Sequence, residues 1–167
     1  MKNVQRRQTG LVLSTSCVNS TGENSGCAVL GPQDTYGETF NSNGGGVFAL
    51  SLTPAGIRQW FFPRKSLPFN VLPLSRDKPT PPDPSTWGTP LADFPGTTCD
   101  IASHFTNLTI ALDVDLCGGW AGSASVFQRT GCGERCVDFV SSENGAFGEA
   151  FWEIGGIWVW APVWQMR

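Results

Sequence analysis

Residues 36–64 read YGETFNSNGGGVFALSLTPAGIRQWFFPR, and this stretch decides the fold. Residues 47–52 and 57–62 are short runs of apolar and aromatic residues that the sequence TPAG separates. A proline and a glycine between two such runs are typical of a β-hairpin. The glycines at 44–46 predict a sharp corner before the first strand. Pro63 predicts the end of the second strand, because proline lacks the N–H group that a sheet ladder needs.

The rest of the chain continues this β-type pattern. Its 167 residues include 20 glycines and 12 prolines, which interrupt short apolar runs and leave no long amphipathic helix pattern. This composition predicts a single all-β domain, either a sandwich or a barrel. The remaining predicted elements are strands at 9–16, 108–116 and 151–160, loops at 17–32 and 36–43, a proline-rich surface loop at 65–98, a helical turn at 101–107, and a loop or short helix at 132–144.

Residues 108–116, LTIALDVDL, show the clearest alternation in the chain. Every even position is apolar, whereas the odd positions are Thr109, Ala111, Asp113 and Asp115. Successive side chains of a strand point to opposite faces, so this pattern predicts one face packed inward and one face open to solvent or ligand.

Charge and hydropathy exclude several classes of function. The net charge is −3 with acidic and basic residues mixed, so there is no basic surface for nucleic acid. No apolar run approaches the ~20 residues that a membrane span needs, and the N-terminus lacks a signal-peptide core. His104 is the only histidine and has no metal-ligand spacing around it, so we expect neither a metal nor another cofactor.

Six cysteines, an even number, indicate disulfides and an oxidising compartment. Cys132 and Cys136 could close a small loop, Cys99 and Cys117 would bracket a strand-like segment, and Cys17 and Cys27 would then remain as a pair. Two glycosylation sequons begin at Asn19 and Asn107 and fit a secreted glycoprotein.

Several motifs, in order, resemble the fungal laminarinase-like branch of glycoside hydrolase family 16, the endo-1,3(4)-β-glucanases. They are YGETFNSNGGGVFA with WFFPR, CVNSTGENSGC at 17–27, WGTP at 87–90, Cys99 with His104-Phe105, CGGWAG at 117–122, and FGEAFWEI at 147–154. The resemblance covers roughly residues 8–158 of the single domain, 1–167. It implies a concanavalin A-like β-jelly-roll sandwich whose concave face holds the glucan, and a retaining mechanism that uses two glutamates.

The family's catalytic motif, G-E-[IL]-D-x-x-E, is absent from this sequence. The chain therefore resembles only the C-terminal half of such an enzyme, and we expect it to expose unpaired strand edges and an uncovered apolar face. No other acidic pair replaces the motif: Asp113 and Asp115 are interpreted as solvated charges, and Glu149 and Glu153 as part of a structural segment. His104 has no G-x-S-x-G serine to serve, so we expect a structural role.

The leading hypothesis is a partial, extracellular hydrolase of O-glycosyl bonds in β-1,3(4)-glucan that lacks the catalytic glutamates. No residue of this chain is expected to be catalytic. Trp120 is the best candidate for substrate binding; Asn43, Trp60 and Arg64 are weaker ones, and a core role for Trp60 fits as well. The alternatives are a non-catalytic glucan-binding or cell-wall protein and a non-functional remnant.

Overall fold

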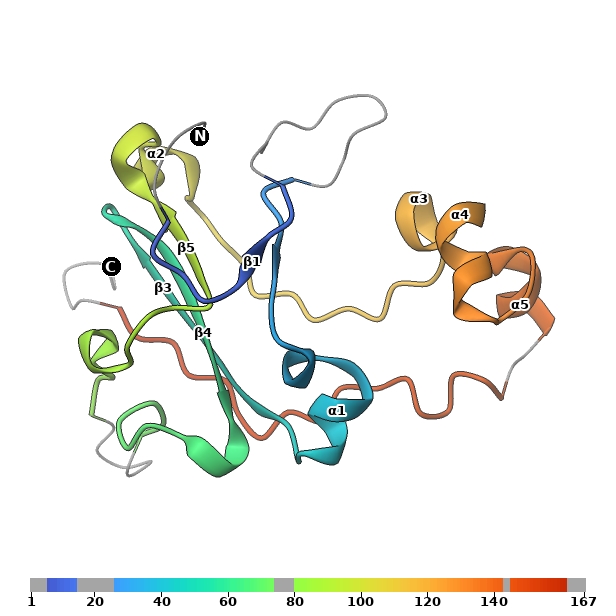
Figure 1. Ribbon diagram of the computed structural model, residues 1–167, viewed down its shortest axis with the longest axis horizontal. Coiled ribbons are helices and arrows are strands. Elements are labelled where there is room, and N and C mark those ends of the chain that lie inside the picture. Colours follow the sequence, from blue (N-terminus) through green and yellow to red (C-terminus); the bar gives the residue numbers. More distant parts are fainter. Residues whose placement is uncertain (1–5, 15–25, 74–79, 143–144, 162–167) are drawn as a thin grey trace. The chain divides into compact units, whose positions relative to one another are not determined.

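The computed structural model describes residues 6–14, 26–73, 80–142 and 145–161. The chain divides into two compact units, Met1–Leu108 and Thr109–Arg167, each of which has its own internal contacts. The first unit contains the β-sheets. The second contains a group of short helices that is preceded and followed by long irregular segments (Figure 1).

The centre of the first unit is an antiparallel sheet of three strands in the order β3–β4–β5. Strands β3 (Gly46–Thr53) and β4 (Gly56–Pro63) form a continuous hairpin in which Leu50 pairs with Gln59. This confirms the predicted hairpin and its end at Pro63. Gly44 and Gly45 turn the chain into β3 with φ of 78° and 76°, a region that favours glycine. Strand β5 (Ala92–Pro95) pairs with the beginning of β4.

Aromatic side chains cover both faces of the hairpin. On one face Trp87, from the proline-rich segment, packs edge-on against Trp60 at 5.3 Å and Phe62 at 5.6 Å between ring centroids. On the other face Phe48 and Phe61 lie 4.9 Å apart, and Phe40 contacts both rings. The proline-rich segment therefore packs against the sheet through Trp87. The prediction of a helix-free loop over 65–98 is correct only in part, because this range contains η3 (Pro84–Thr86) and strand β5, and η2 (Arg64–Ser66) overlaps its beginning.

The N-terminal residues extend the β-structure of the first unit. Strand β1 (Leu11–Val12) pairs with β2 (Val29–Leu30), which lies in a segment predicted to be a loop. The N–H groups of Thr9 and Gly10 donate to the carbonyls of Pro90 and Leu91, each at 2.9 Å. The segment before β1 thus runs beside the chain that leads into β5.

The loop predicted at 36–43 is also wrong. Residues 36–43 contain α1 (Gly37–Ser42), which follows η1 (Gln33–Thr35). The short helix is favoured because it places Phe40 on the rings of Phe48 and Phe61, a tertiary contact that local turn propensities do not reveal. The predicted helical turn after Cys99 is confirmed as α2 (Ile101–His104), which follows η4 (Gly96–Thr98).

Among its described residues the second unit contains four short helices: α3 (Gly118–Ala121), α4 (Ala124–Phe127), η5 (Gln128–Thr130) and α5 (Cys136–Ser142). Phe139 lies 6.0 Å from both Phe127 and Phe147 between ring centroids, and these three rings form its small core. A disulfide joins Cys117, just before α3, to Cys136 at the start of α5.

That disulfide corrects two predicted pairings. Cys99 and Cys132 are free thiols, so neither Cys99–Cys117 nor Cys132–Cys136 forms. The Cα atoms of Cys117 and Cys136 are 5.6 Å apart, within the range that a disulfide requires, although the residues are 19 apart in sequence. Cys27 is disulfide-bonded, and Cys17 lies outside the described residues.

The strands predicted at 108–116 and 151–160 are not formed. Both segments run without strand pairing to any described residue, and nearly all their side chains are exposed (Figure 1). A strand is stable only beside a partner strand, so a correct alternation pattern alone does not produce one. No helix within the described residues is long and apolar enough to cross a membrane.

Candidate functional site

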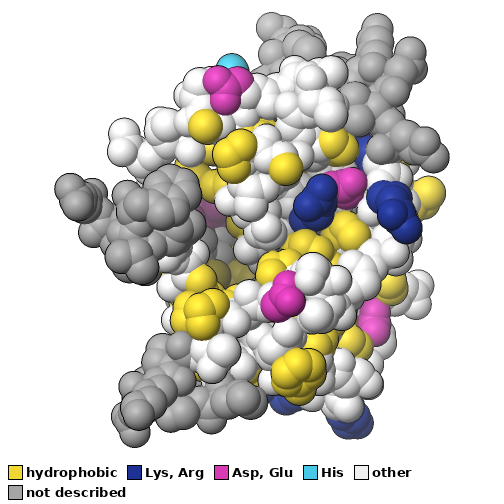
Figure 2. All heavy atoms as spheres, turned by 90° about the vertical axis from the view of Figure 1, so that its left-hand side faces the viewer, with side chains coloured by type: hydrophobic (Ala, Val, Ile, Leu, Met, Phe, Trp, Pro, Cys, Tyr) yellow, Lys and Arg dark blue, Asp and Glu magenta, His cyan; other side chains and the backbone are white. Residues whose placement is uncertain are grey.

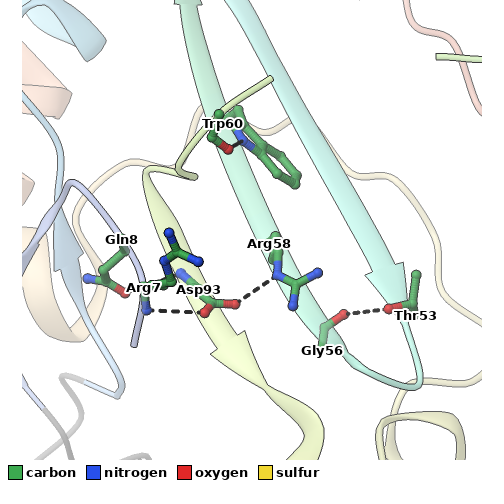
Figure 3. Close-up of polar contacts among 8 residues, drawn as sticks. Arg7, Gln8, Thr53, Gly56, Arg58, Trp60 and Asp93 are labelled. Carbon is green, nitrogen blue, oxygen red and sulfur yellow. Dashed lines mark hydrogen bonds and ion pairs between the residues drawn. The ribbon is translucent and has the colours of Figure 1, made fainter. Parts of the chain in front are cut away.

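Asp93 is the only acidic side chain among the described residues that is buried, and its exposed fraction is 5%. Its Oδ1 atom accepts a hydrogen bond from Arg58 Nε at 3.1 Å, and its Oδ2 atom accepts one from the Arg7 backbone N–H at 3.3 Å (Figure 3). The Asp93 backbone N–H donates to Gln8 Oε1 at 3.1 Å. Both carboxylate oxygens are therefore occupied, and Asp93 ties β4 and β5 to the N-terminal segment.

The other acidic candidates lie at the surface. Asp113, Asp115, Glu149 and Glu153 are all exposed. Within the part of the chain that the structure describes, no group of three or more His, Cys, Asp or Glu side chains could hold a metal ion. His104 is also exposed, and its Nδ1 atom lies 2.8 Å from the carbonyl of Asp100, the residue directly before α2, which fits the structural role expected for it.

Trp120, the principal candidate for sugar contact, lies on α3 and is 78% exposed. Cys117 adopts a left-handed φ of 63° and Gly118 one of 73°, so the backbone turns sharply immediately before the helix. The Cys117–Cys136 disulfide then fixes this turn to α5. A flat indole ring held at the surface in this way can stack on the C–H face of a pyranose ring.

Asn43 and Arg64 are brought together at one end of the hairpin. Arg64 Nε donates to the Gly44 carbonyl at 2.6 Å, and its backbone N–H donates to the Gly45 carbonyl at 3.1 Å. Asn43 is the residue directly before this corner and ends α1. Both side chains are exposed, so they remain available for polar contacts with a ligand.

Trp60 lies apart from these surface residues because it is buried in the sheet. Its exposed fraction is 4%, and its indole N–H donates to the Gly88 carbonyl at 3.1 Å. Because so little of its ring reaches the surface, Trp60 is not accessible for stacking on a sugar. The structure therefore places it in the core, which is the alternative role that the sequence allows.

Sequence reasoning did not select a small hollow beside this core. The hollow has a volume of about 180 Å³ and is lined by Trp87, Asp34, Thr9 and Thr89, among others. Trp87 is fixed there by its indole N–H, which donates to Asn70 Oδ1 at 2.7 Å. The WGTP motif at 87–90 was the available signal, but it marks a family resemblance and does not specify a cavity.

Comparison with known proteins places these observations in a family. Residues 1–160 match the model of the XgeA-like, catalytic GH16 domain. A probable glycosidase of Schizosaccharomyces pombe is 42% identical over 96% of this chain and 37% of its own length. A probable endo-1,3(4)-beta-glucanase of Aspergillus clavatus is 40% identical over 89% of this chain and 23% of its own length. The chain thus spans well under half of these curated relatives.

Two solved structures of laminarinase 16A have the same fold. A mutant that cyclizes laminariheptaose superposes with a TM-score of 0.72 at 38% identity, over 87% of this chain and 49% of that chain. The enzyme from Phanerochaete chrysosporium, with two beta-glucans in its donor and acceptor sites, gives 0.71 at 40% identity. The fold is accordingly part of a β-jelly roll. This chain belongs to glycoside hydrolase family 16, in its XgeA-like branch.

Proposed function

We propose that this chain binds β-1,3(4)-glucan and forms part of the substrate cleft of a retaining endo-1,3(4)-β-glucanase. The observation that carries the proposal is the match of residues 1–160 to a catalytic domain whose relatives are named endo-1,3(4)-beta-glucanases. Hydrolysis would need the family's paired glutamates, and this sequence does not contain their motif. The chain's own contribution is therefore binding.

Trp120 is the residue that we propose for stacking on the glucan. Its ring is 78% exposed and follows a turn whose backbone the Cys117–Cys136 disulfide anchors, so the indole is accessible at a defined position of the chain. Asn43 and Arg64 are proposed as polar contacts, because amide and guanidinium groups donate hydrogen bonds to sugar hydroxyls. Trp60 is not proposed as a contact, because it is 4% exposed.

The test is titration of the purified full chain with laminarin oligosaccharides by isothermal calorimetry, together with a reducing-sugar assay. We expect measurable affinity without hydrolysis. Trp120→Ala should weaken binding by about tenfold, which corresponds to about 1.4 kcal/mol. Trp158→Ala is the matched control, since Trp158 is another exposed tryptophan of the second unit, with 42% of its surface accessible.

Equal losses in the two variants would contradict the role given to Trp120, and absence of laminarin affinity in the unaltered chain would contradict glucan binding itself. Sugar release by the chain alone would contradict the assignment of catalysis to the missing glutamates. Retained binding that never accompanies hydrolysis, even beside the rest of a family domain, would favour the second candidate, a non-catalytic glucan-binding protein.

We also propose an extracellular location. The Cys117–Cys136 disulfide supports it, because disulfides persist mainly in oxidising compartments. Asn107 is exposed and adopts a left-handed φ of 52° within its sequon, so its side chain is accessible for glycosylation. The second sequon, at Asn19, lies outside the described residues. Treatment of the natively produced protein with an N-glycosidase should reduce its mass, and Asn107→Gln should remove that change at this site.

A further inference from the structure

The small hollow beside the sheet of the first unit is a cavity that glucan binding at Trp120, Asn43 and Arg64 does not use. It has a volume of about 180 Å³, and its described lining belongs entirely to the first unit. Sites for drug-sized ligands have volumes of about 300–1,000 Å³. This hollow therefore has room only for a small molecule or for the end group of a larger one.

Aromatic rings form much of the wall of the hollow. The Trp87 ring stands at 82° to the Trp60 ring and at 77° to the Phe62 ring, with ring centroids 5.3 Å and 5.6 Å apart. Trp60 and Phe62 are alternate residues of β4, so they share one face of that strand. Trp87 and Phe62 are only half-buried, and parts of their rings are therefore accessible.

Asp34 is the only charged residue among the described residues that line the hollow. Within the described chain no lysine or arginine forms an ion pair with Asp34, and no group donates a hydrogen bond to its carboxylate. Its side chain is half-buried and thus partly removed from water. A carboxylate in that setting is stabilised by a positively charged partner.

Both Asp34 and Trp87 are held in place by contacts of their neighbours. Asp34 lies in η1, whose next residue, Thr35, is buried. The Thr35 hydroxyl and backbone N–H both donate to the Pro32 carbonyl, at 2.6 Å and 3.0 Å. The Trp87 indole N–H donates to Asn70 Oδ1 at 2.7 Å. The carboxylate and the ring are therefore placed before any ligand arrives, which limits the conformational cost of binding.

The lining of the hollow differs from the rest of the visible surface. On the face shown in Figure 2, hydrophobic side chains reach the surface in several places, with both acidic and basic side chains among them. The hollow instead combines several aromatic rings with a single negative charge among its described residues. Aromatic rings on several sides of a site, together with negative charge, are suited to an ammonium group through cation–π attraction.

We propose that the hollow binds the ammonium group of a small organic cation. The Asp34 carboxylate supplies the opposite charge, and the rings of Trp87 and Phe62 supply the cation–π contacts. A neutral sugar suits the hollow less well, because it would leave the carboxylate without a charged partner. A metal ion also suits it less well, since no group of three or more His, Cys, Asp or Glu side chains is assembled in the described chain. The site does not depend on the proposed glucan binding.

The experiment is titration of the nitrogen-15-labelled full chain with choline, followed through the indole N–H signals of its seven tryptophans. We expect saturable shifts of the Trp87 and Trp60 signals, with a dissociation constant on the order of 1 mM, and no shift for Trp120, which does not line the hollow. Dimethylbutanol, the neutral analogue in which carbon replaces the nitrogen of choline, should bind about tenfold more weakly or not at all.

Two variants test the role of the carboxylate. Asp34→Asn should weaken choline binding about tenfold, whereas Glu38→Gln should leave it unchanged. Both substitutions remove one negative charge, but Glu38 is exposed on α1 and does not line the hollow. Added sodium chloride should weaken choline binding to the unaltered chain, because salt screens the attraction between the two charges.

The inference is overturned if choline shifts neither the Trp87 nor the Trp60 signal, if dimethylbutanol binds as tightly as choline, or if the two variants have equal effects. Saturable shifts with D-glucose but not with choline would assign the hollow to a neutral saccharide, and would overturn the inference as well. The comparison of choline with dimethylbutanol uses the unaltered chain, so it decides the question even if Asp34→Asn does not fold.

Discussion

Replacement of Trp60 tests whether this tryptophan belongs to the core or to the glucan site. Its ring is 4% exposed, packs edge-on against Trp87 at 5.3 Å, and donates a hydrogen bond to the Gly88 carbonyl at 3.1 Å. Trp60→Phe removes the hydrogen bond, which contributes about 1 kcal/mol, and part of the buried ring. The buried carbon atoms contribute about 0.8 kcal/mol per methylene equivalent. We therefore expect a loss of about 2–3 kcal/mol.

Trp60→Ala should be more costly. It removes the whole ring, including the aromatic pair with Trp87, and leaves a cavity in the sheet. Large-to-small changes of buried tryptophan and phenylalanine cost about 3–5 kcal/mol. Gly88 itself is exposed, so water can satisfy its carbonyl after either change, which keeps the hydrogen-bond contribution at the low end of its range.

The assay is urea unfolding of the full chain followed by circular dichroism, with laminarin affinity measured below the transition. Trp152→Phe is a matched control: its indole N–H also donates to a backbone carbonyl, that of Asp113 at 3.0 Å, but its side chain is 60% exposed. This control should change stability by less than about 0.5 kcal/mol. The reasoning is refuted if Trp60→Phe leaves the unfolding midpoint unchanged and instead reduces laminarin affinity about tenfold.

Four further perturbations follow from single contacts. Asp93→Ala should cost about 2–3 kcal/mol in urea unfolding because it leaves Arg58 and the Arg7 N–H without their acceptor; an unchanged midpoint would contradict this. Replacing Cys117 and Cys136 by Ser removes a cross-link between residues 19 apart in sequence and should lower the free energy of unfolding of the second unit by about 3 kcal/mol. Hydrogen exchange should then become faster in α5 but not in β3 or β4. Hydrogen bonds from the Ser85 hydroxyl and N–H hold the pKa of Asp83 below its ordinary 3.8. The stability that these bonds confer on the folded state is therefore complete above pH 3.8, and it is lost as the pH falls through the lower pKa that Asp83 has in the folded protein. Ser85→Ala should therefore raise the pKa of Asp83 in a carbon-13 NMR titration, and an unmoved pKa would exclude the hydroxyl hydrogen bond as a cause. Gly46→Ala should lower the unfolding midpoint, because its new methyl group would meet the Phe61 ring and the Phe62 carbonyl at 2.5 Å, whereas Gly119→Ala meets nothing and should be neutral.

Local patterns were sufficient to predict the β3–β4 hairpin. Its strands are adjacent in sequence, its turn contains proline and glycine, and Pro63 ends its second strand, so each determinant lies within residues 44–63. The turn at α2 was predictable for the same reason, because Asp100 caps it through a hydrogen bond from the Ser103 N–H at 3.3 Å.

Features that depend on distant residues were not predictable. Helix α1 depends on the packing of Phe40 against the hairpin, and the Arg58–Asp93 ion pair joins residues 35 apart in sequence. The Cys117–Cys136 disulfide likewise depends on where two helices begin in space. The strand predicted at 108–116 was wrong, because its alternation is a local pattern and no described residue pairs with this segment as a strand.

For the candidate site, the sequence was sufficient to select Trp120, Asn43 and Arg64, but it could not show how exposed these side chains are or which residues they contact. The exposure of Trp120 and the contact between Arg64 and Gly44 became evident only in the structure. For Trp60 the sequence left two roles open, because an aromatic residue in a strand can face either the core or a ligand.

The two free thiols among the described residues are natural attachment sites for spin labels. Cys99 lies in the first unit and is partly accessible, whereas Cys132 lies in the second and is exposed. Maleimide spin labels would therefore place one probe in each unit without any substitution, provided that labelling is confined to these two cysteines. Pulsed electron resonance would then report the distribution of distances between the two units, with and without laminarin.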